Sequence, residues 1–385
     1  MGVEFRLGGQ DHNKVEDFLA HRPSGVHAIV LDTKAAKHQQ AAAEAAVDAG
    51  VEVLFEPATE RLTEPGYELP GLAYYRPELY NIDILSRDHA ARAGLVDAVF
   101  SATPSFVTVR TPPHFFVRDE RAAHLNVALA EDAHVRYGGK LRPTLVLSSR
   151  YPAAAAGQLA AEYVAAGITE LELRISPLGG EYESVRKVRT AFALLDAFTS
   201  AGLTVTLGQS GNIGQVALAL GHAGHYSVGI GMREKVDHVA AITRQKTPPK
   251  QSEDGEKQSG GPTAGIYLPG LALTTKPQVG RGFLTNTDIR TRVGCRLGIC
   301  GTSVRGPGLD PRAHYLHART HEVQQLLSRP QQWRQSSEID RLRRALELRE
   351  LVNRNYLTDG AKPIPTRTLG SLINDIEGER AHRTA

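Results

Sequence analysis

Short runs of β-forming residues alternate with alanine-rich runs of helical character along most of the chain from Val26 onward. This alternation predicts a strand, then a helix, then the next strand, with several helices ending at a glycine. Eight strands are expected from it, at residues 26–31, 51–55, 105–110, 144–148, 170–175, 203–207, 226–231 and 265–269. Strands separated by helices in this number predict a closed (β/α)8 barrel of the TIM type. An open doubly wound sheet is the alternative.

The same pattern divides the chain into three parts. The barrel is expected over residues 1–290, and a polar stretch at 246–264 is expected to be a disordered insertion within it. A cysteine- and histidine-containing lobe with C-terminal helices is expected over residues 291–360. Residues 361–385 are expected to form a loosely ordered tail.

Composition excludes several classes of protein. The 385 residues are 41% hydrophobic and 23% charged, which is typical of a soluble globular protein. No apolar run approaches the roughly 20 residues of a membrane helix, and the N-terminus lacks the layout of a signal peptide, so a cytoplasmic location is expected. No GxGxxG follows the first strand and no GxxxxGK[ST] occurs, so dinucleotide and P-loop chemistry have no support. The net charge of +3 permits a nucleic-acid partner without requiring one.

Polar residues follow several of the predicted strands, and a parallel barrel carries its functional groups at these carboxyl ends. Asp32 and Glu56 come after neighbouring strands, where paired carboxylates can act as general acid and base or as nucleophile and acid. Arginines at the same rim would attract an anion, and glycine-rich strand ends offer backbone N–H groups to phosphate or simply make tight turns. The expected substrate- or phosphate-binding residues are Arg110, Arg150, Arg174, Gln209, Gly229, Gly231 and Arg233.

Glu172 and Arg174 alternate with Leu171 and Leu173 in the fifth predicted strand. Period two places both charges on one face, and the leucines are expected to meet the helices. The charges should therefore point into the barrel, where a buried ion is either paired or used in function.

Both cysteines of the chain, Cys295 and Cys300, fall within one glycine-rich stretch. A run with His314, His317 and His321 follows, and this spacing places the three imidazoles on one face of a helix. Two thiolates and helical imidazoles are the ligands of a tetrahedral zinc site. We expect zinc bound by the two cysteines with His317 and His321. Buried unligated thiols and solvent-facing histidines are the alternative.

The order of these parts resembles the tRNA-guanine transglycosylase family, including its branch that inserts deazaguanines into DNA. The resemblance depends on Cys295 and Cys300 after the last predicted strand and on Arg312-Ala313-His314-Tyr315-Leu316-His317. It implies a (β/α)8 barrel, a zinc subdomain and base exchange on a nucleic acid. Two cysteines stand where the family has three, and residues 263–274 contain no acid to match the family's nucleophilic aspartate.

Three functions are compatible with these observations. The first is an enzyme acting on a nucleobase or nucleic acid by transglycosylase-like or related N-glycosidic chemistry, with structural zinc. The second is a nucleic-acid-binding component without catalysis. The third is a barrel lyase, isomerase or hydrolase for a small anionic metabolite. The sequence leaves the choice of RNA or DNA and the oligomeric state open.

Overall fold

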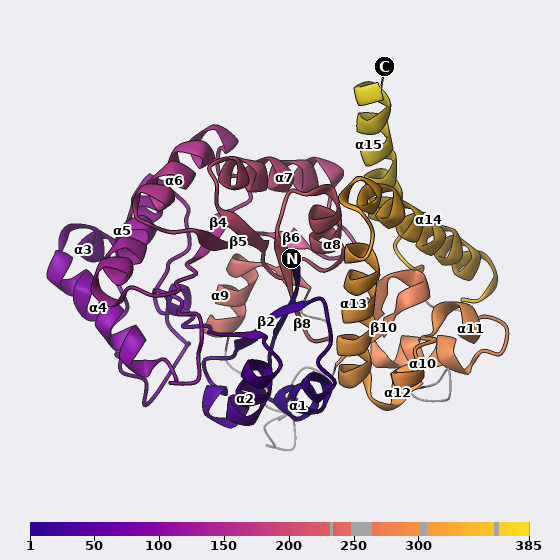
Figure 1. Cartoon of the computed structure of the whole chain (residues 1–385), viewed down its shortest axis with the longest axis horizontal. Coiled ribbons are helices and arrows are strands. Elements are labelled where there is room, and N and C mark those ends of the chain that lie inside the picture. Colours follow the sequence, from indigo (N-terminus) through magenta and orange to yellow (C-terminus); the bar gives the residue numbers. More distant parts are fainter. Residues whose placement is uncertain (232–233, 248–263, 301–305, 358–361, 385) are drawn as a thin grey trace.

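A computed structural model describes residues 1–231, 234–247, 264–300, 306–357 and 362–384. Its centre is a curled, seven-stranded parallel sheet with helices around its outer face (Figure 1). The strands run in the order β3-β2-β1-β8-β7-β5-β4. They are β1 (Gly2–Arg6), β2 (Val26–Leu31), β3 (Glu52–Phe55), β4 (Thr144–Ser148), β5 (Glu170–Ser176), β7 (Thr204–Leu207) and β8 (His225–Gly229). A short antiparallel pair, β6 (Leu178–Gly179) with β9 (Lys235–Val236), lies beyond the sheet.

The helices between the strands pack their apolar sides onto the sheet and form the main core with it. Several begin at an aspartate or serine whose side chain accepts a backbone N–H, as Asp119 and Ser184 do. In chain order they are α1 (His12–Ala20), α2 (Gln40–Asp48), α3 (Ile82–Arg87), α4 (His89–Ala102), α5 (Glu120–Tyr137), α6 (Ala153–Ala165), α7 (Val185–Ser200), α8 (Gly211–Leu220) and α9 (His238–Lys246).

The predicted strand at 105–110 is wrong. Val109 and Arg110 make only isolated parallel bridges, to Leu54 and Leu141, and Val117 makes another to Leu147. Pro112 and Pro113 lack the N–H groups that a regular strand would donate here. An irregular segment therefore runs between the edge strands β3 and β4, and the sheet is a curled half-barrel rather than the predicted closed (β/α)8 barrel.

The sequence analysis also missed β1, which lies in the middle of the sheet between β2 and β8. Val3 and Phe5 face the helices, where the Phe5 ring meets Phe18 edge to face at 5.9 Å. Glu4 and Arg6 alternate with them and are buried on the concave side of the sheet.

A C-terminal lobe stands beside the curled sheet (Figure 1). The predicted eighth strand belongs to this lobe, because it pairs antiparallel with the next strand and not with the parallel sheet. The second core of the molecule packs around this hairpin and begins at Ile266, so the lobe starts earlier than the expected boundary at 290. Its elements are β10 (Ile266–Leu268), β11 (Leu273–Thr275), α10 (Pro277–Thr285), α11 (Arg290–Val293), α12 (Gly306–Leu309), α13 (Pro311–Leu327), α14 (Gln331–Asn355) and α15 (Arg367–Thr384).

The chain after residue 361, expected to be loosely ordered, is helical from Arg367, and Leu372 and Ile373 of α15 are buried in the main core. Of the expected insertion at 246–264, residues 248–263 lie outside the described residues. Within the described ranges, no helix combines the length and apolar composition needed to cross a bilayer.

Candidate functional site

A cluster of charged side chains fills the concave side of the curled sheet near the carboxyl ends of its strands. Arg6 of β1 donates from Nη1 to Glu172 Oε1 of β5 at 3.1 Å, and Arg174 donates from Nη2 to Glu172 Oε2 at 2.7 Å. Thr144 and Ser227 also donate their hydroxyls to Glu172, at 3.2 and 3.1 Å. The Glu172 carboxylate is therefore buried and paired. The alternation along β5 predicts that this charge points to the inner face of the sheet, as it does.

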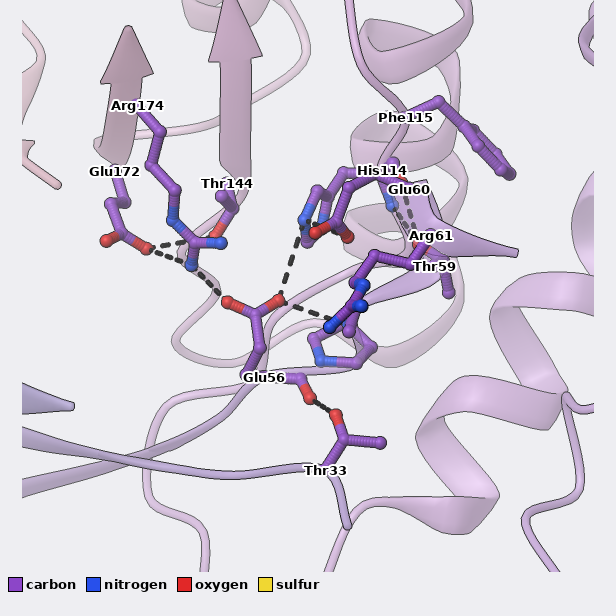
Figure 2. Close-up of polar contacts among 12 residues, drawn as sticks. Thr33, Glu56, Thr59, Glu60, Arg61, His114, Phe115, Thr144, Glu172 and Arg174 are labelled. Carbon is purple, nitrogen blue, oxygen red and sulfur yellow. Dashed lines mark hydrogen bonds and ion pairs between the residues drawn. The ribbon is translucent and has the colours of Figure 1, made fainter. Parts of the chain in front are cut away.

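Glu56, which follows β3, lies at the centre of the cluster (Figure 2). Both Arg6 and Arg174 donate to its Oε2 atom, and its Oε1 atom accepts the N–H of Ala58 at 3.1 Å. The Glu56 side chain is 11% exposed. Two guanidinium groups thus hold one carboxylate in a fixed position at the edge of the sheet.

On the other side of Glu56 lie Glu60 and His114 (Figure 2). Glu60 comes from the 3-10 turn η2 (Thr59–Arg61), and His114 comes from the irregular segment between β3 and β4. Thr59 Oγ1 donates to the carbonyl of His114 at 2.7 Å and accepts its N–H at 2.8 Å, which locks the two segments together. The next residue, Phe115, is held in the same way by the side-chain amide of Asn126.

Burial and charge act in opposite directions on these groups. Burial disfavours the ionised form of Glu56, but the charges of Arg174 and Arg6 outweigh it and hold its pKa below the ordinary value. Burial likewise opposes ionisation of Glu60, yet its interaction with the His114 imidazole, 3.3 Å away, lowers its pKa to about 2. Burial works against protonation of His114, while Glu60 and then Glu56 raise its pKa. The carboxylates are therefore ionised at neutral pH.

Gly208, directly after β7, makes room for this cluster. A Cβ atom at this position would lie 2.5 Å from Arg174 Cγ and 2.7 Å from Glu172 Oε1. The glycine at the end of this strand therefore admits the buried Glu–Arg pair.

Asp32, the other predicted acid, is half-buried at the end of β2, and its Oδ1 atom accepts the N–H of Lys34 at 2.9 Å. Burial first, and then the negative charges of Asp32, Glu60 and Glu56, raise the pKa of the Tyr67 hydroxyl. The guanidinium of Arg61 lies 3.9 Å from the ring centroid.

The structure separates the predicted anion-binding residues. Arg174 belongs to the cluster, where Glu56 and Glu172 occupy its Nη2 atom. Arg110 is exposed near the amino end of the sheet, where its backbone N–H donates to the carbonyl of Lys140. The irregular segment reaches the carboxyl end of the sheet only at His114–Val117. Arg150 is exposed in the turn after β4.

The remaining predicted residues follow the last strands of the sheet. Gln209 has a positive φ of 48° and donates its N–H to Ser227 Oγ at 2.9 Å. Gly229 ends β8 and is buried, and Gly231 has a φ of 83° beside Gly265. Arg233 lies outside the described residues.

A second candidate site lies in the C-terminal lobe, where Cys295, Cys300 and His314 each offer a ligand atom within 4.8 Å of the other two. His314 is 2% exposed, and its Nε2 atom lies 2.7 Å from the backbone carbonyl of Tyr267. Donation there leaves the Nδ1 atom, which has no hydrogen-bond partner, as the ligand atom. A hydrogen bond from Cys300 is the main reason that the pKa of the Cys295 thiol falls to about 4. Two sulfurs and one imidazole suit zinc among the common metals.

His317 and His321 lie outside this group. The His317 ring packs edge to face on Phe18 of α1 at 5.1 Å, and His321 Nε2 lies 2.8 Å from Gln325 Nε2. Each residue of a helix advances it by about 1.5 Å, so His321 lies roughly 10 Å along α13 from His314. Among the described residues the group has three members, and His314 at the start of the helix is its histidine.

Sequence analysis did not point to Arg6 or Glu60, and His114, which stands just beyond the predicted strand at 105–110, was visible at that strand end but was not included in the expected site. A signal for Arg6 was present, because Glu4-Phe5-Arg6 in β1 repeats the Glu-x-Arg spacing of Glu172-Leu173-Arg174 in β5. Glu60 and His114 stand in a turn and an irregular segment, and no periodic pattern marks either position.

Comparisons with known proteins bear only on the fold. No family model matches the chain, and no curated protein matches it. A solved structure described as a deoxyribose-phosphate aldolase from Toxoplasma gondii is 12% identical, with a TM-score of 0.34, over 59% of this chain and 88% of that one. A protein described as a fructose-1,6-bisphosphate aldolase from Coccidioides immitis is 12% identical, with a TM-score of 0.32, over 59% of this chain and 73% of that one.

A third solved structure is the carboxyl transferase domain of Rhizobium etli pyruvate carboxylase. It is 11% identical, with a TM-score of 0.37, over 99% of this chain and 54% of that one. None of the three is a tRNA-guanine transglycosylase. Similarities at this level carry no information on activity. The strand order itself shows an α/β protein built on a curled, seven-stranded parallel sheet.

Proposed function

We propose that the protein is an enzyme that breaks or exchanges an N-glycosidic bond to a nucleobase at the carboxyl edge of the curled sheet. The observation that carries this proposal is the fixed, ionised carboxylate of Glu56 beside the half-buried Asp32. Glycosidic chemistry develops positive charge on the sugar, and a pair of carboxylates can stabilise that charge and act as nucleophile, acid or base. Such a site at the carboxyl ends of parallel strands is the usual position in this architecture.

The two acids have different roles in this proposal. Glu56 is bound by Arg6, Arg174 and the N–H of Ala58, so it remains ionised and supplies a fixed negative charge. Among the described residues, the Asp32 side chain accepts a hydrogen bond only within its own turn, from the N–H of Lys34, which leaves a carboxylate oxygen for the substrate. We therefore assign Asp32 as the reacting group.

Replacing Asp32 by alanine tests this assignment. We expect base release or exchange, assayed with nucleosides, tRNA and DNA oligonucleotides, to fall by about 10²–10⁴-fold, because a group of this kind contributes that factor. The melting temperature should remain close to that of the unmodified protein, because Asp32 bonds only locally. Asp48→Ala is the matched control, because Asp48 is the exposed last residue of α2.

Two results would favour the other functions. Salt-sensitive binding of RNA or DNA that survives Asp32→Ala, with no product, would indicate a nucleic-acid-binding component. Thermal stabilisation by a small phosphorylated or carboxylated metabolite, without any effect of nucleosides or nucleic acids, would indicate a metabolite enzyme. Retained turnover in Asp32→Ala would remove this residue from the mechanism.

The proposal includes structural zinc at Cys295, Cys300 and His314. The closeness of the two sulfurs to His314, and the Nδ1 atom of this histidine, which has no hydrogen-bond partner among the described residues, support it, because zinc binds thiolates and a neutral imidazole. Metal analysis of the purified protein is expected to give about one zinc per chain. Cys295→Ser and His314→Gln should reduce the zinc content to near zero, whereas His321→Gln should retain it. Zinc-free protein of unchanged stability would contradict this part of the proposal.

A further inference from the structure

Glu56, Glu60 and His114 offer three ligand atoms within 4.8 Å of one another. His114 Nε2 lies 3.3 Å from Glu60 Oε2 and 3.6 Å from Glu56 Oε1. Ligand atoms that share one face of a divalent ion, each about 2.1 Å from it, are separated from one another by about 3 Å. The observed spacing therefore admits one ion after a small approach of the three side chains.

Two of these three atoms lack the hydrogen bonds that buried polar atoms normally make. Among the described residues, neither His114 Nε2 nor Glu60 Oε2 makes a hydrogen bond of good geometry; the two atoms face each other at 3.3 Å, and the side chains are only 2% and 10% exposed. Such an atom costs about 1–3 kcal/mol if nothing binds it. His114 Nδ1 faces the carbonyl of Pro112 at 3.4 Å, so a proton placed on Nδ1 leaves the Nε2 lone pair directed at the two carboxylates.

The charge balance of the cluster also favours a cation. Glu56, Glu60 and Glu172 are three carboxylates, whereas Arg6 and Arg174 are the two guanidinium groups that contact them. With a neutral imidazole, the buried cluster carries one net negative charge, which either a proton on His114 or a bound cation offsets. One divalent ion would change this to one net positive charge, which attracts an anionic group of a substrate.

We propose that Glu56, Glu60 and His114 bind a divalent cation of the Mn²⁺ class at the carboxyl edge of the sheet. Two carboxylate oxygens and one imidazole nitrogen suit Mn²⁺ or Fe²⁺, while the sulfur-rich group in the lobe suits zinc. The ion would hold an oxygen atom of the substrate as a Lewis acid. The two proposals are tested separately, because one concerns metal binding and the other the bond that is broken. With the ion bound, Glu56 would be its ligand, and Asp32 would remain the reacting carboxylate.

Titration with Mn²⁺ tests the proposal directly. The protein is purified with its zinc in place, treated to remove weakly held metal, and titrated while electron paramagnetic resonance measures free Mn²⁺. We expect one Mn²⁺ per chain, and a Kd that rises about tenfold or more in His114→Gln and in Glu60→Gln, because each loses one ligand. Glu78→Gln and His38→Gln are matched controls at exposed positions and should bind Mn²⁺ as the unmodified protein does.

A second measurement does not depend on any variant folding. In the unmodified protein labelled at its histidine rings, bound Mn²⁺ should broaden the resonances of His114 and leave those of His225 sharp. Broadening of His225 instead, or a Kd unchanged in both ligand variants, would overturn the proposal. Asp32→Ala separates the two proposals, because it should abolish turnover and keep the Mn²⁺ affinity. If the protein binds no Mn²⁺ in the titration and still turns over its substrate, the metal site is wrong and the proposed reaction is retained.

Discussion

The two ends of the curled sheet carry similar residues in different electrostatic arrangements. At the carboxyl end lie Glu56, Glu60 and His114, and at the amino end lie Glu4, His27 and His225. Each group offers three possible ligand atoms within 4.8 Å. Residue type and proximity alone therefore do not distinguish the two ends.

The number of available charges does distinguish them. At the amino end, Glu4 is matched one to one by Arg142, whose Nη2 donates at 2.8 Å, and Thr206 donates to it at 2.9 Å. The rings of His27 and His225 stack with centroids 3.5 Å apart, and burial first, then the charge of His27, lower the pKa of His225 to about 2. The amino end is thus a bonded ion pair beside two neutral histidines.

The carboxyl end has three carboxylates and two guanidinium groups. Both ends hold buried nitrogens without a hydrogen-bond partner among the described residues, His114 Nε2 at one end and His225 Nδ1 at the other, so charge balance alone separates them. The comparison teaches that a histidine–carboxylate cluster indicates function when its carboxylates outnumber the guanidinium groups that bind them. A cluster whose charges are matched within the protein indicates structure.

The largest predicted effect comes from removing one arginine at each end. Arg142→Met should lower the free energy of unfolding by about 3–5 kcal/mol, because it leaves Glu4 buried without its cation. Arg174→Met should cost at least as much, because both Glu56 and Glu172 lose a partner. Urea denaturation measures both values. Arg150→Met, at an exposed position, should change the free energy by less than about 0.5 kcal/mol.

Paired substitutions sharpen the same comparison. Glu4→Gln combined with Arg142→Met should recover most of the lost stability, because a matched pair can be replaced by neutral side chains. Glu172→Gln combined with Arg174→Met should recover much less, because Glu56 still lacks that cation. Equal recovery at both ends would show that the carboxyl end is also a set of matched pairs, and the comparison would fail.

Much of the sheet could be predicted from the sequence, because β2, β3, β4, β7 and β8 are largely apolar runs and β5 alternates apolar with charged or polar residues over seven positions, each next to helix signals. β1 was missed because Glu4 and Arg6 interrupt its apolar residues, and only long-range ion pairs make these charges acceptable inside the fold. The strand predicted at 105–110 failed because the prolines that follow prevent regular pairing. Closure of a barrel depends on such pairing and has no local signal.

The candidate site was predictable only in part. Glu56 and Arg174 could be named, because strand ends and strand alternation are visible in the sequence. Glu60 and His114 reach Glu56 through a turn and an irregular segment held together by Thr59. Contacts of this kind depend on tertiary structure. In the lobe, the sequence showed the two cysteines and a helix with three histidines, but the position of the helix determines which histidine faces them.

The smaller predicted effect concerns the amino end and acid pH. The pKa of His225 is about 2 in the folded protein and about 6.5 in the unfolded chain, so only the unfolded chain takes up this proton as the pH falls from 7 to 5. The contribution of His225 to stability is therefore present above about pH 6.5 and lost below it. By linkage, the loss from pH 7 to pH 5 is about 2 kcal/mol.

His225→Phe should remove this contribution, because phenylalanine keeps a ring against His27 and does not titrate. From pH 7 to pH 5, the free energy of unfolding of the unmodified protein should fall by about 2 kcal/mol more than that of the variant. His27 remains in both proteins, and its other charged neighbours are Glu4, Glu52 and Arg142. His38→Phe, at an exposed position, should show no such shift. An unchanged difference for His225→Phe would mean that His225 binds its proton in the folded protein, and the amino end would then carry a charged histidine next to Arg142.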